Sequence, residues 1–229
     1  MNLIHDLGRL FFPHYCVGCG TDALDTASSL CLRCLHALPL SNFHDYADNP
    51  VERAFTGRVS FVAGTAFCHF THGSLMQQVL HALKYRGRRD AGRMLGRMMG
   101  EQLQGCPRFA GIEALIPVPL HAAKERKRGY NQSALLCEGM AEAWGLPVIQ
   151  KAVLRISPTG TQTHKSRVER WQNMEGRFRL ARPALAEGRH VLLVDDVVTT
   201  GATMEACAQA LLQAKGLRLS VAALAWAAG

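Results

Sequence analysis

The sequence predicts an α/β protein with a parallel, doubly wound sheet and a small cysteine-rich module at its N-terminus. Three observations support this prediction. Apolar strands alternate with amphipathic helices from about residue 57 onward, as in parallel sheets with helices on both faces. Residues 191–194 are apolar at every position, as in a strand buried on both faces. Residues 16–34 contain two Cys-x-x-Cys pairs, a spacing typical of structural zinc sites.

The pattern divides the chain into two unequal domains. A chain of 229 residues is long enough for one sizeable core and a small satellite. Residues 1–45 are rich in Cys, Gly and His without a sustained helical period, so we expect a zinc ribbon of two knuckles there. Residues 45–56 are expected to form a linker, and residues 57–229 the α/β domain.

The first half of the α/β domain predicts one strand and two helices. Residues 59–70 alternate in the manner of a strand. A helix should follow, with Thr71 or Ser74 as its N-cap. Its apolar stripe repeats at helical spacing through Met76, Val79, Leu80 and Leu83. A second helix is expected over about 90–104, where glycines at every fourth position favour close packing against another helix.

The second half continues the alternation. A short strand at 112–116 precedes Pro117, and a helix is expected at 133–144. After the buried strand at 191–194, a helix at 202–215 should end at Gly216, before a last strand at 217–226. Ligands of such sheets bind at the carboxyl ends of the strands, which directs attention to the residues that follow position 194.

Composition narrows the class of protein. With 48% hydrophobic and 19% charged residues, the chain reads as an ordinary folded protein. Its apolar runs are too short to cross a bilayer, so no membrane insertion is expected. Residues 1–15 lack the long apolar segment of a secretory signal, which predicts a cytoplasmic protein. The net charge of +8 favours a polyanionic partner.

The most informative segment is VLLVDDVVTTGAT at residues 191–203. Two carboxylates end a buried strand, and small hydroxyl residues lead into a helix whose free N–H groups form a phosphate cradle. The carboxylates suit the vicinal hydroxyls of a ribose. Neither a P-loop nor a dinucleotide motif competes with this interpretation. The predicted ribose 5-phosphate site consists of Asp195, Asp196, Thr199, Thr200, Gly201, Ala202 and Thr203.

This segment resembles the phosphoribosyl pyrophosphate (PRPP) loop of type I phosphoribosyltransferases. The resemblance implies the fold of that class and PRPP, with Mg²⁺, as the ligand. Residues 116–121 and 126–133 are similar to the pyrophosphate loop of the glutamine amidotransferase branch of that fold. The implied pyrophosphate contacts are Pro119, Leu120, His121, Arg126 and Arg128.

Together with residues 81–87 and 159–162, these segments make nearly the whole chain resemble the ComF family. That family links a zinc ribbon to a phosphoribosyltransferase-like domain and is associated with DNA uptake in naturally competent bacteria. The resemblance implies a mobile flap between about residues 155 and 179. Purine-salvage relatives usually carry an acidic general base where Thr199 stands. Because threonine cannot accept a proton at neutral pH, purine salvage is disfavoured.

The paired cysteines predict a closed tetrahedral site for one structural Zn²⁺ ion. A redox pair is the alternative, but a thioredoxin-like motif would follow a strand. His14 or His36 could replace one thiolate. The predicted metal ligands are Cys16, Cys19, Cys31 and Cys34. The four remaining cysteines stand singly in apolar surroundings and are expected to be core thiols: Cys68, Cys106, Cys137 and Cys207.

Two basic clusters occupy residues 84–97 and 124–128. They are interpreted as solvated faces, as a pyrophosphate clamp or as a track for single-stranded nucleic acid. Tyr85, Tyr130 and Trp171 would supply stacking faces for such a track. The candidate DNA contacts are Arg86, Arg88, Arg89 and Lys124.

The leading hypothesis is a ComF-like DNA-utilisation protein of natural transformation. It would bind PRPP and single-stranded DNA, with other DNA-uptake proteins as candidate partners. The competing hypothesis is an active phosphoribosyltransferase that transfers ribose 5-phosphate from PRPP to an unknown acceptor. A third hypothesis treats the domain as a relic scaffold for partner proteins. The acid pair and the phosphate loop argue against the relic, because a loop without a ligand has no need of them.

Overall fold

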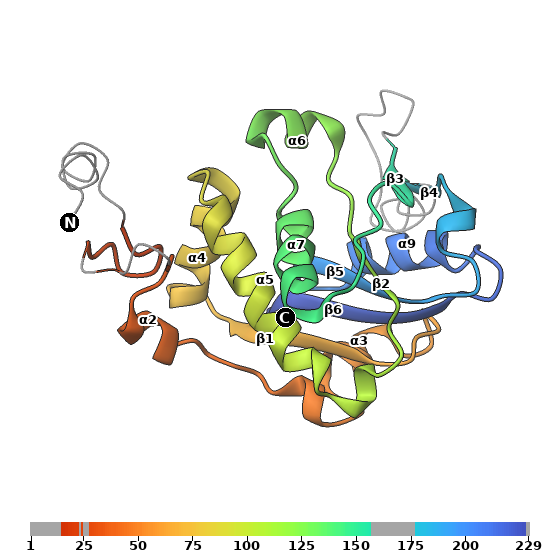
Figure 1. Cartoon of the computed structure of the whole chain (residues 1–229), viewed down its shortest axis with the longest axis horizontal. Coiled ribbons are helices and arrows are strands. Elements are labelled where there is room, and N and C mark those ends of the chain that lie inside the picture. The colour runs from red at the N-terminus through yellow and green to blue at the C-terminus, as the bar shows by residue number, and fades with distance from the viewer. Residues whose placement is uncertain (1–14, 23, 25–27, 157–176, 228–229) are drawn as a thin grey trace, which may run out of the picture.

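A four-stranded parallel sheet forms the centre of the protein in the computed structural model, which describes residues 15–22, 24, 28–156 and 177–227 (Figure 1). The strands are ordered β1-β6-β5-β2, and every neighbouring pair is parallel. This confirms the α/β class. The four strands are β1 (Gly64–Phe70), β2 (Ala114–Pro117), β5 (His190–Val198) and β6 (Arg218–Ala227).

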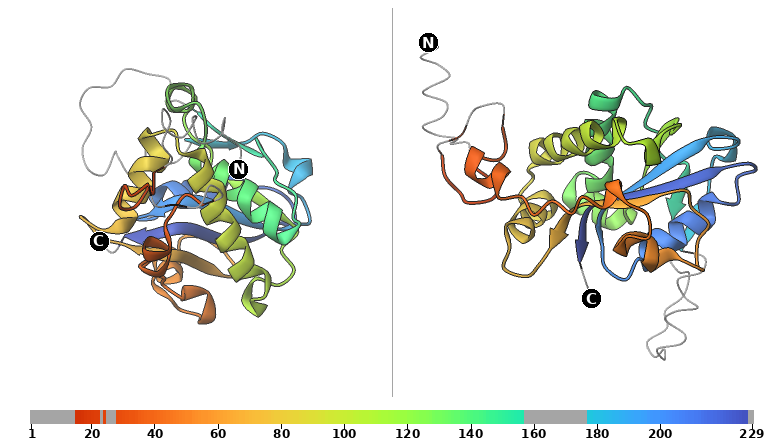
Figure 2. Two further views of the ribbon diagram at one scale, coloured as in Figure 1. Left: turned by 60° about the vertical axis from the view of Figure 1, so that its left-hand side comes forward. Right: turned by 90° about the horizontal axis from the view of Figure 1, so that it is seen from below.

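Helices cover both faces of the sheet (Figure 2). In β5, Leu192 and Val194 belong to one apolar cluster, whereas Val191 and Leu193 belong to the other, so the sheet is doubly wound. The helices of the first cluster are α4 (Leu75–Tyr85), α5 (Arg89–Gln104) and α7 (Gln132–Trp144). Those of the second are α3 (Pro50–Phe55) and α9 (Ala202–Leu211).

Shorter elements surround this core. Helix α2 (Leu32–His36) belongs to the cysteine module, and α6 (Ala122–Arg128) follows β2. An antiparallel pair is formed by β3 (Val153–Arg155) and β4 (Phe178–Leu180). The 3₁₀ turns are η1 (Phe43–Asp45), η2 (Pro107–Phe109) and η3 (Pro183–Leu185). In the part of the chain that the structure describes, no helix is long and apolar enough to span a membrane.

Most helix boundaries agree with those predicted. Ser74 caps α4 by accepting a hydrogen bond from the N–H of Gln77, and the four expected stripe residues are buried. Helix α9 ends at Leu211 and not at Lys215, because the chain tightens into turns such as Ala214 N–H to Leu211 O at 2.9 Å. The first strand begins at Gly64, five residues later than expected.

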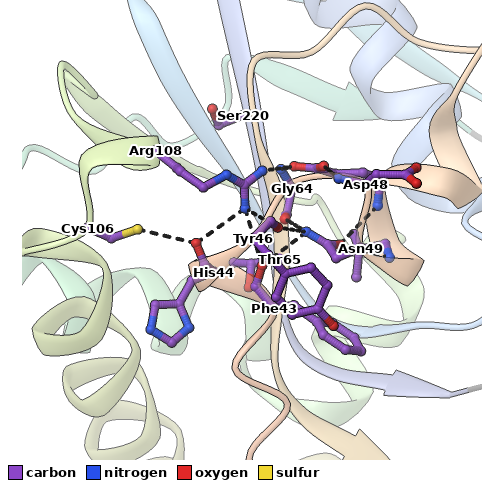
Figure 3. Close-up of polar contacts among 12 residues, drawn as sticks. Phe43, His44, Tyr46, Asp48, Asn49, Gly64, Thr65, Cys106, Arg108 and Ser220 are labelled. Carbon is purple, nitrogen blue, oxygen red and sulfur yellow. Dashed lines mark hydrogen bonds and ion pairs between the residues drawn. The ribbon is translucent and has the colours of Figure 1, made fainter.

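The linker predicted at 45–56 is wrong, because this segment contains α3 and is fixed by a buried polar network (Figure 3). Asn49 is fully buried and caps α3, and its amide also donates to the Gly64 carbonyl at 2.8 Å. Arg108 donates to the carbonyls of residues 43, 44 and 46 and to the Glu52 carboxylate. The segment therefore packs against the sheet, while the domain limits at 45 and 57 stay a prediction.

The predicted close helix packing is found between α5 and α7. A Cβ at Gly96 would overlap the backbone of Leu136, and one at Gly139 would overlap the backbone of Arg93. Ion pairs flank the contact, with Arg93 and Glu138 atoms 2.8 Å apart. Since α5 holds α7 against the sheet, the first turn of α7 has a fixed position at the carboxyl end of β5.

Candidate functional site

A cavity of ≈ 260 Å³ lies at the carboxyl ends of β2 and β5. The last turn of α4, the segment from β2 to α7 and the start of α9 complete its walls. It brings together eight of the residues predicted for PRPP, pyrophosphate or DNA: Pro119, Leu120, Lys124, Arg128, Asp195, Asp196, Thr199 and Thr203. The cavity therefore lies where doubly wound sheets bind ligands.

The two adjacent carboxylates have different surroundings. Asp195 Oδ1 accepts hydrogen bonds from Ser133 Oγ at 2.9 Å and from the Asp196 N–H at 2.8 Å. Asp196 Oδ2 lies 3.1 Å from Lys84 Nζ. Burial, followed by the neighbouring Asp196 charge, raises the pKa of Asp195 to about 7. The pair thus offers acceptor oxygens to hydroxyl groups while it carries less than two full negative charges at neutral pH.

The loop after β5 is built for close approach of an anion. Gly201 has a φ of 77° and serves as the N-cap of α9 without a side-chain cap, so first-turn N–H groups are left for a ligand. A Cβ at this position would lie 2.8 Å from Phe55 Cε1, so glycine is required for two reasons. Arg58 Nη1, 2.9 Å from Glu205 Oε2, ties α9 to the chain after α3.

Four cations also line the cavity: Lys84, Lys124, Arg128 and Arg155. Arg128 Nη1 donates to Gln132 Oε1 at 2.8 Å, and the Arg155 guanidinium lies 5.3 Å from the centre of the Phe178 ring. Burial, followed by the charge of Arg177, lowers the pKa of Arg155. The cavity thus combines two carboxylates with four cations.

Several predicted residues do not line the cavity. Thr200, Gly201 and Ala202 lie beside it at the start of α9. There they would offer backbone N–H groups to a ligand. His121 caps α6 by accepting a hydrogen bond from the Ala123 N–H at 3.2 Å. Arg126 is exposed on α6. The expected flap, including Trp171, lies mostly outside the described residues.

The predicted DNA contacts fall into two groups. Arg88 donates to the Tyr15 carbonyl at 2.6 Å and pairs with Asp90 at 2.6 Å. Arg89 donates to the Gly129 carbonyl at 2.8 Å and covers the Tyr130 ring. Both side chains therefore hold segments of this protein together. Arg86 and Lys124 are exposed, and each lines a cavity. The role of all four in DNA binding stays a prediction.

The four predicted cysteine ligands form one cluster. Their sulfur atoms all lie within 4.8 Å of one another, and Cys19 Sγ is 3.7 Å from Cys31 Sγ. Zinc–sulfur bonds of about 2.3 Å place thiolates about 3.8 Å apart in a tetrahedron, so the cluster fits a structural metal such as zinc. The backbone N–H of Thr21 lowers the pKa of Cys19 to about 6, which favours the thiolate.

The other cysteines and histidines that the sequence analysis considered have different positions. His36 is not a member of it, and His14 lies outside the described residues. Cys68, Cys137 and Cys207 are fully buried, as expected of core thiols. Cys106 is partly exposed, and its Sγ contacts the His44 carbonyl at 3.3 Å.

The cysteine module packs against the start of the α/β domain (Figure 1). Cys16, Leu30 and Cys34 belong to the same apolar cluster as α4 and α5. Ser29 Oγ donates to Asp90 Oδ2 at 2.6 Å. A Cβ at Gly18 would overlap Leu75, so the first knuckle lies directly on α4.

Comparisons with known proteins agree with this architecture. The phosphoribosyl transferase domain model matches residues 145–228. DNA utilization protein YhgH of Salmonella typhi is 35% identical over 138 residues, which cover 59% of this chain and 60% of that protein. Competence protein F of Haemophilus influenzae is 40% identical over 96 residues, covering 40% and 41%. Competence protein ComFC of Bacillus subtilis is 30% identical over 154 residues, covering 66% and 59%.

Among solved structures, glutamine PRPP amidotransferase from B. subtilis, complexed with ADP and GMP, matches with a TM-score of 0.43 and 20% identity. The match covers 63% of this chain and 30% of that chain.

A doubly wound parallel sheet, an acid pair at the carboxyl end of β5 and the matching domain model define a protein of the phosphoribosyltransferase fold. The four-cysteine cluster adds a module that fits a zinc ribbon. In sequence the chain is similar to DNA utilization protein YhgH and to competence proteins F and ComFC. It spans about 60% of the length of the YhgH proteins that it matches.

Proposed function

We propose that this protein is a cytoplasmic DNA-utilisation protein that binds PRPP, with Mg²⁺, in the cavity beside β5 and binds single-stranded DNA nearby. The observation that carries the PRPP proposal is the combination of two carboxylates and four cations in one cavity. Carboxylates accept hydrogen bonds from ribose hydroxyls, whereas cations and helix N-termini bind phosphates. PRPP carries both kinds of group.

Each part of PRPP has a matching part of the cavity. The start of α9 suits the 5-phosphate, and Asp195 with Asp196 suits the ribose hydroxyls. Lys84, Lys124 and Arg128 suit the pyrophosphate. Mg²⁺ would be held mainly by the pyrophosphate oxygens, since this ion keeps few protein ligands.

Calorimetry with PRPP and Mg²⁺ tests this assignment. We expect one PRPP per chain, and we expect the double variant Asp195→Ala/Asp196→Ala to lose at least tenfold in affinity because buried hydroxyls lose their acceptors. Glu138→Ala/Glu142→Ala is the matched control, since it also removes two carboxylates, but from the α5–α7 contact. Equal PRPP affinity in the Asp double variant and the wild type would contradict the site assignment.

The second candidate function is phosphoribosyl transfer to an unknown acceptor, which the completeness of the carboxylate and cation set favours. Thr199 lines the cavity and cannot act as a general base, so an acceptor would have to arrive already nucleophilic. A pyrophosphate-release assay across bases and amines separates the two functions. Release that depends on an acceptor supports transfer, whereas PRPP binding without release supports the DNA-handling role.

The DNA proposal is supported by the net charge of +8, by the basic helix α6 and by the similarity to DNA utilization protein YhgH. We expect micromolar binding of a labelled single strand, with little sequence preference. Affinity should fall with added salt, by about 0.7 log units per tenfold salt for each phosphate neutralised. Fluorescence anisotropy at two salt concentrations measures this. Absence of binding at low salt would remove DNA from the proposed function.

A further inference from the structure

A second cavity, of ≈ 350 Å³, adjoins the PRPP cavity between the end of α4 and α6. Lys84, Lys124 and Arg128 line both cavities, so the two share a wall. The linings nevertheless differ in charge. The second cavity contains Lys127 and two tyrosines, and no carboxylate is among its described lining residues. It therefore suits an anion but offers no carboxylate to sugar hydroxyls.

Tyr85 is the unusual residue of this cavity. Its exposure is 67%, although an aromatic ring of this size is normally covered. The ring is held from two sides, with its centroid 5.0 Å from that of His81 and 5.3 Å from the Arg128 guanidinium. A fixed, exposed ring among cations is the arrangement that proteins use to stack a nucleobase beside its phosphate.

The surface continues beyond Tyr85 along α4. His81 and Arg86 line a larger groove of ≈ 810 Å³ between α4 and the first cysteine knuckle. Helix α4 has 11 residues and is thus about 16 Å long. The exposed face of α4 therefore joins the second cavity to this groove over a length greater than one nucleobase. A single strand can follow such a path, whereas a free nucleotide needs only the cavity.

We propose that Tyr85 is a base-stacking residue for single-stranded DNA and that Lys124 and Lys127 contact the phosphates next to the stacked base. This proposal rests on the DNA part of the proposed function and assigns it a location. It replaces Arg88 and Arg89, which bind backbone carbonyls of this chain, as the centre of the DNA contact.

The test measures anisotropy of a fluorescein-labelled oligo-dT with the full chain at low salt. We expect Tyr85→Ala to weaken binding about tenfold, since stacking on one aromatic ring has an effect of that order. Tyr85→Phe and Tyr85→Trp should bind within about twofold of the wild type. Tyr46→Ala is the matched control, because Tyr46 is 47% exposed and lines neither cavity. Thermal unfolding of each variant verifies that it is folded.

The outcomes separate this inference from the function on which it rests. A wild type that does not bind the oligonucleotide defeats the DNA part of the proposed function. If Tyr85→Ala binds the oligonucleotide as tightly as the wild type does, the stacking role of Tyr85 is overturned, and the proposed function still stands. The stacking role is also overturned if Tyr85→Phe loses as much affinity for the oligonucleotide as Tyr85→Ala does. If free dTMP binds as tightly as oligo-dT and with the same dependence on Tyr85, the cavity belongs to a free nucleotide instead.

Discussion

Asp195 accepts two hydrogen bonds, yet burial and the charge of Asp196 raise its pKa to about 7. In an unfolded chain an aspartate has a pKa near 3.9. The folded protein therefore holds this proton more tightly than the unfolded chain between about pH 4 and pH 7. Its free energy of unfolding falls as the pH rises through that window. Above about pH 7 the decrease is complete and stays constant.

Asp195→Asn should remove this loss. At pH 8 we expect the variant to have a free energy of unfolding about 4 kcal/mol higher than the wild type, and at pH 4 we expect little difference. The amide oxygen can still accept from Ser133. Urea denaturation at the two pH values measures the effect.

Asp90→Asn provides a control of opposite sign for that experiment. Although burial opposes it, the Arg88 guanidinium lowers the pKa of Asp90 to about 2. A lowered pKa stabilises the folded protein above the unfolded pKa, so Asp90→Asn should be less stable than the wild type at pH 8. If Asp195→Asn also loses stability at pH 8, Asp195 is stabilising as a carboxylate and the burial argument is wrong.

Among single site residues, the sequence predicts those that form local motifs. Asp195 and Asp196 are adjacent in the chain, and the metal ligands stand in pairs, so type and spacing suffice. The sequence does not identify Ser133 as the partner of Asp195, because the contact joins positions 62 residues apart. Lys84 is a lone cation in the last turn of α4, and nothing local distinguishes it from a solvated lysine.

The contact between α5 and α7 shows how glycines can determine the position of a helix. Gly96 and Gly139 bring the two helix backbones together, and α7 carries Ser133 in its first turn. The separation of the helices therefore determines where Ser133, a residue that lines the cavity beside β5, lies.

Gly139→Ala should force α7 away from α5. We expect it to lower the free energy of unfolding by about 3 kcal/mol, since overpacking of a tight contact costs an amount of this order. Gly105→Ala is the matched control, because Gly105 ends α5 at a φ of −88° with nothing within 4 Å of a Cβ. Thermal and urea unfolding compare the two. Similar stability in both variants would show that the helices separate easily.

The sequence predicts long elements better than short ones. Helices α4, α5 and α7 have 11 to 16 residues, enough for a repeated apolar stripe. Helix α3 has six residues, and its buried stripe amounts to Val51 and Phe55 with Glu52 beside them. Asn49 followed by Pro50 is a typical sequence signal for the start of a helix, but the segment is too short for periodicity to confirm it.

The whole molecule combines a small cysteine module with a large sheet domain, and the two share an apolar cluster. The module has few buried side chains of its own, so we expect its shape to depend on its four clustered cysteines. Sequence predicts the module from its spacing, but its packing on α4 depends on contacts such as that of Gly18 with Leu75.

We expect one zinc ion per chain by elemental analysis and its loss in Cys31→Ser, because three thiolates leave the tetrahedron incomplete. Residues 15–38 should then become sensitive to protease, while the sheet domain stays folded. Cys106→Ser is the matched control, since a serine can keep the contact with the His44 carbonyl. A Cys31→Ser protein with a protease-resistant module would contradict the structural role of the metal.

The turn between α4 and α5 sets the distance between a residue of the cavity beside β5 and a residue that contacts the cysteine module. Lys84, before the turn, reaches Asp196, and Arg88, after it, holds the backbone of Tyr15 beside the cysteines. One extra residue between Lys84 and Arg88 would change the spacing and the relative direction of the two side chains, so that they could no longer make both contacts. The chain length from residue 84 to residue 88 is therefore constrained by geometry, and length changes belong in other parts of the sequence.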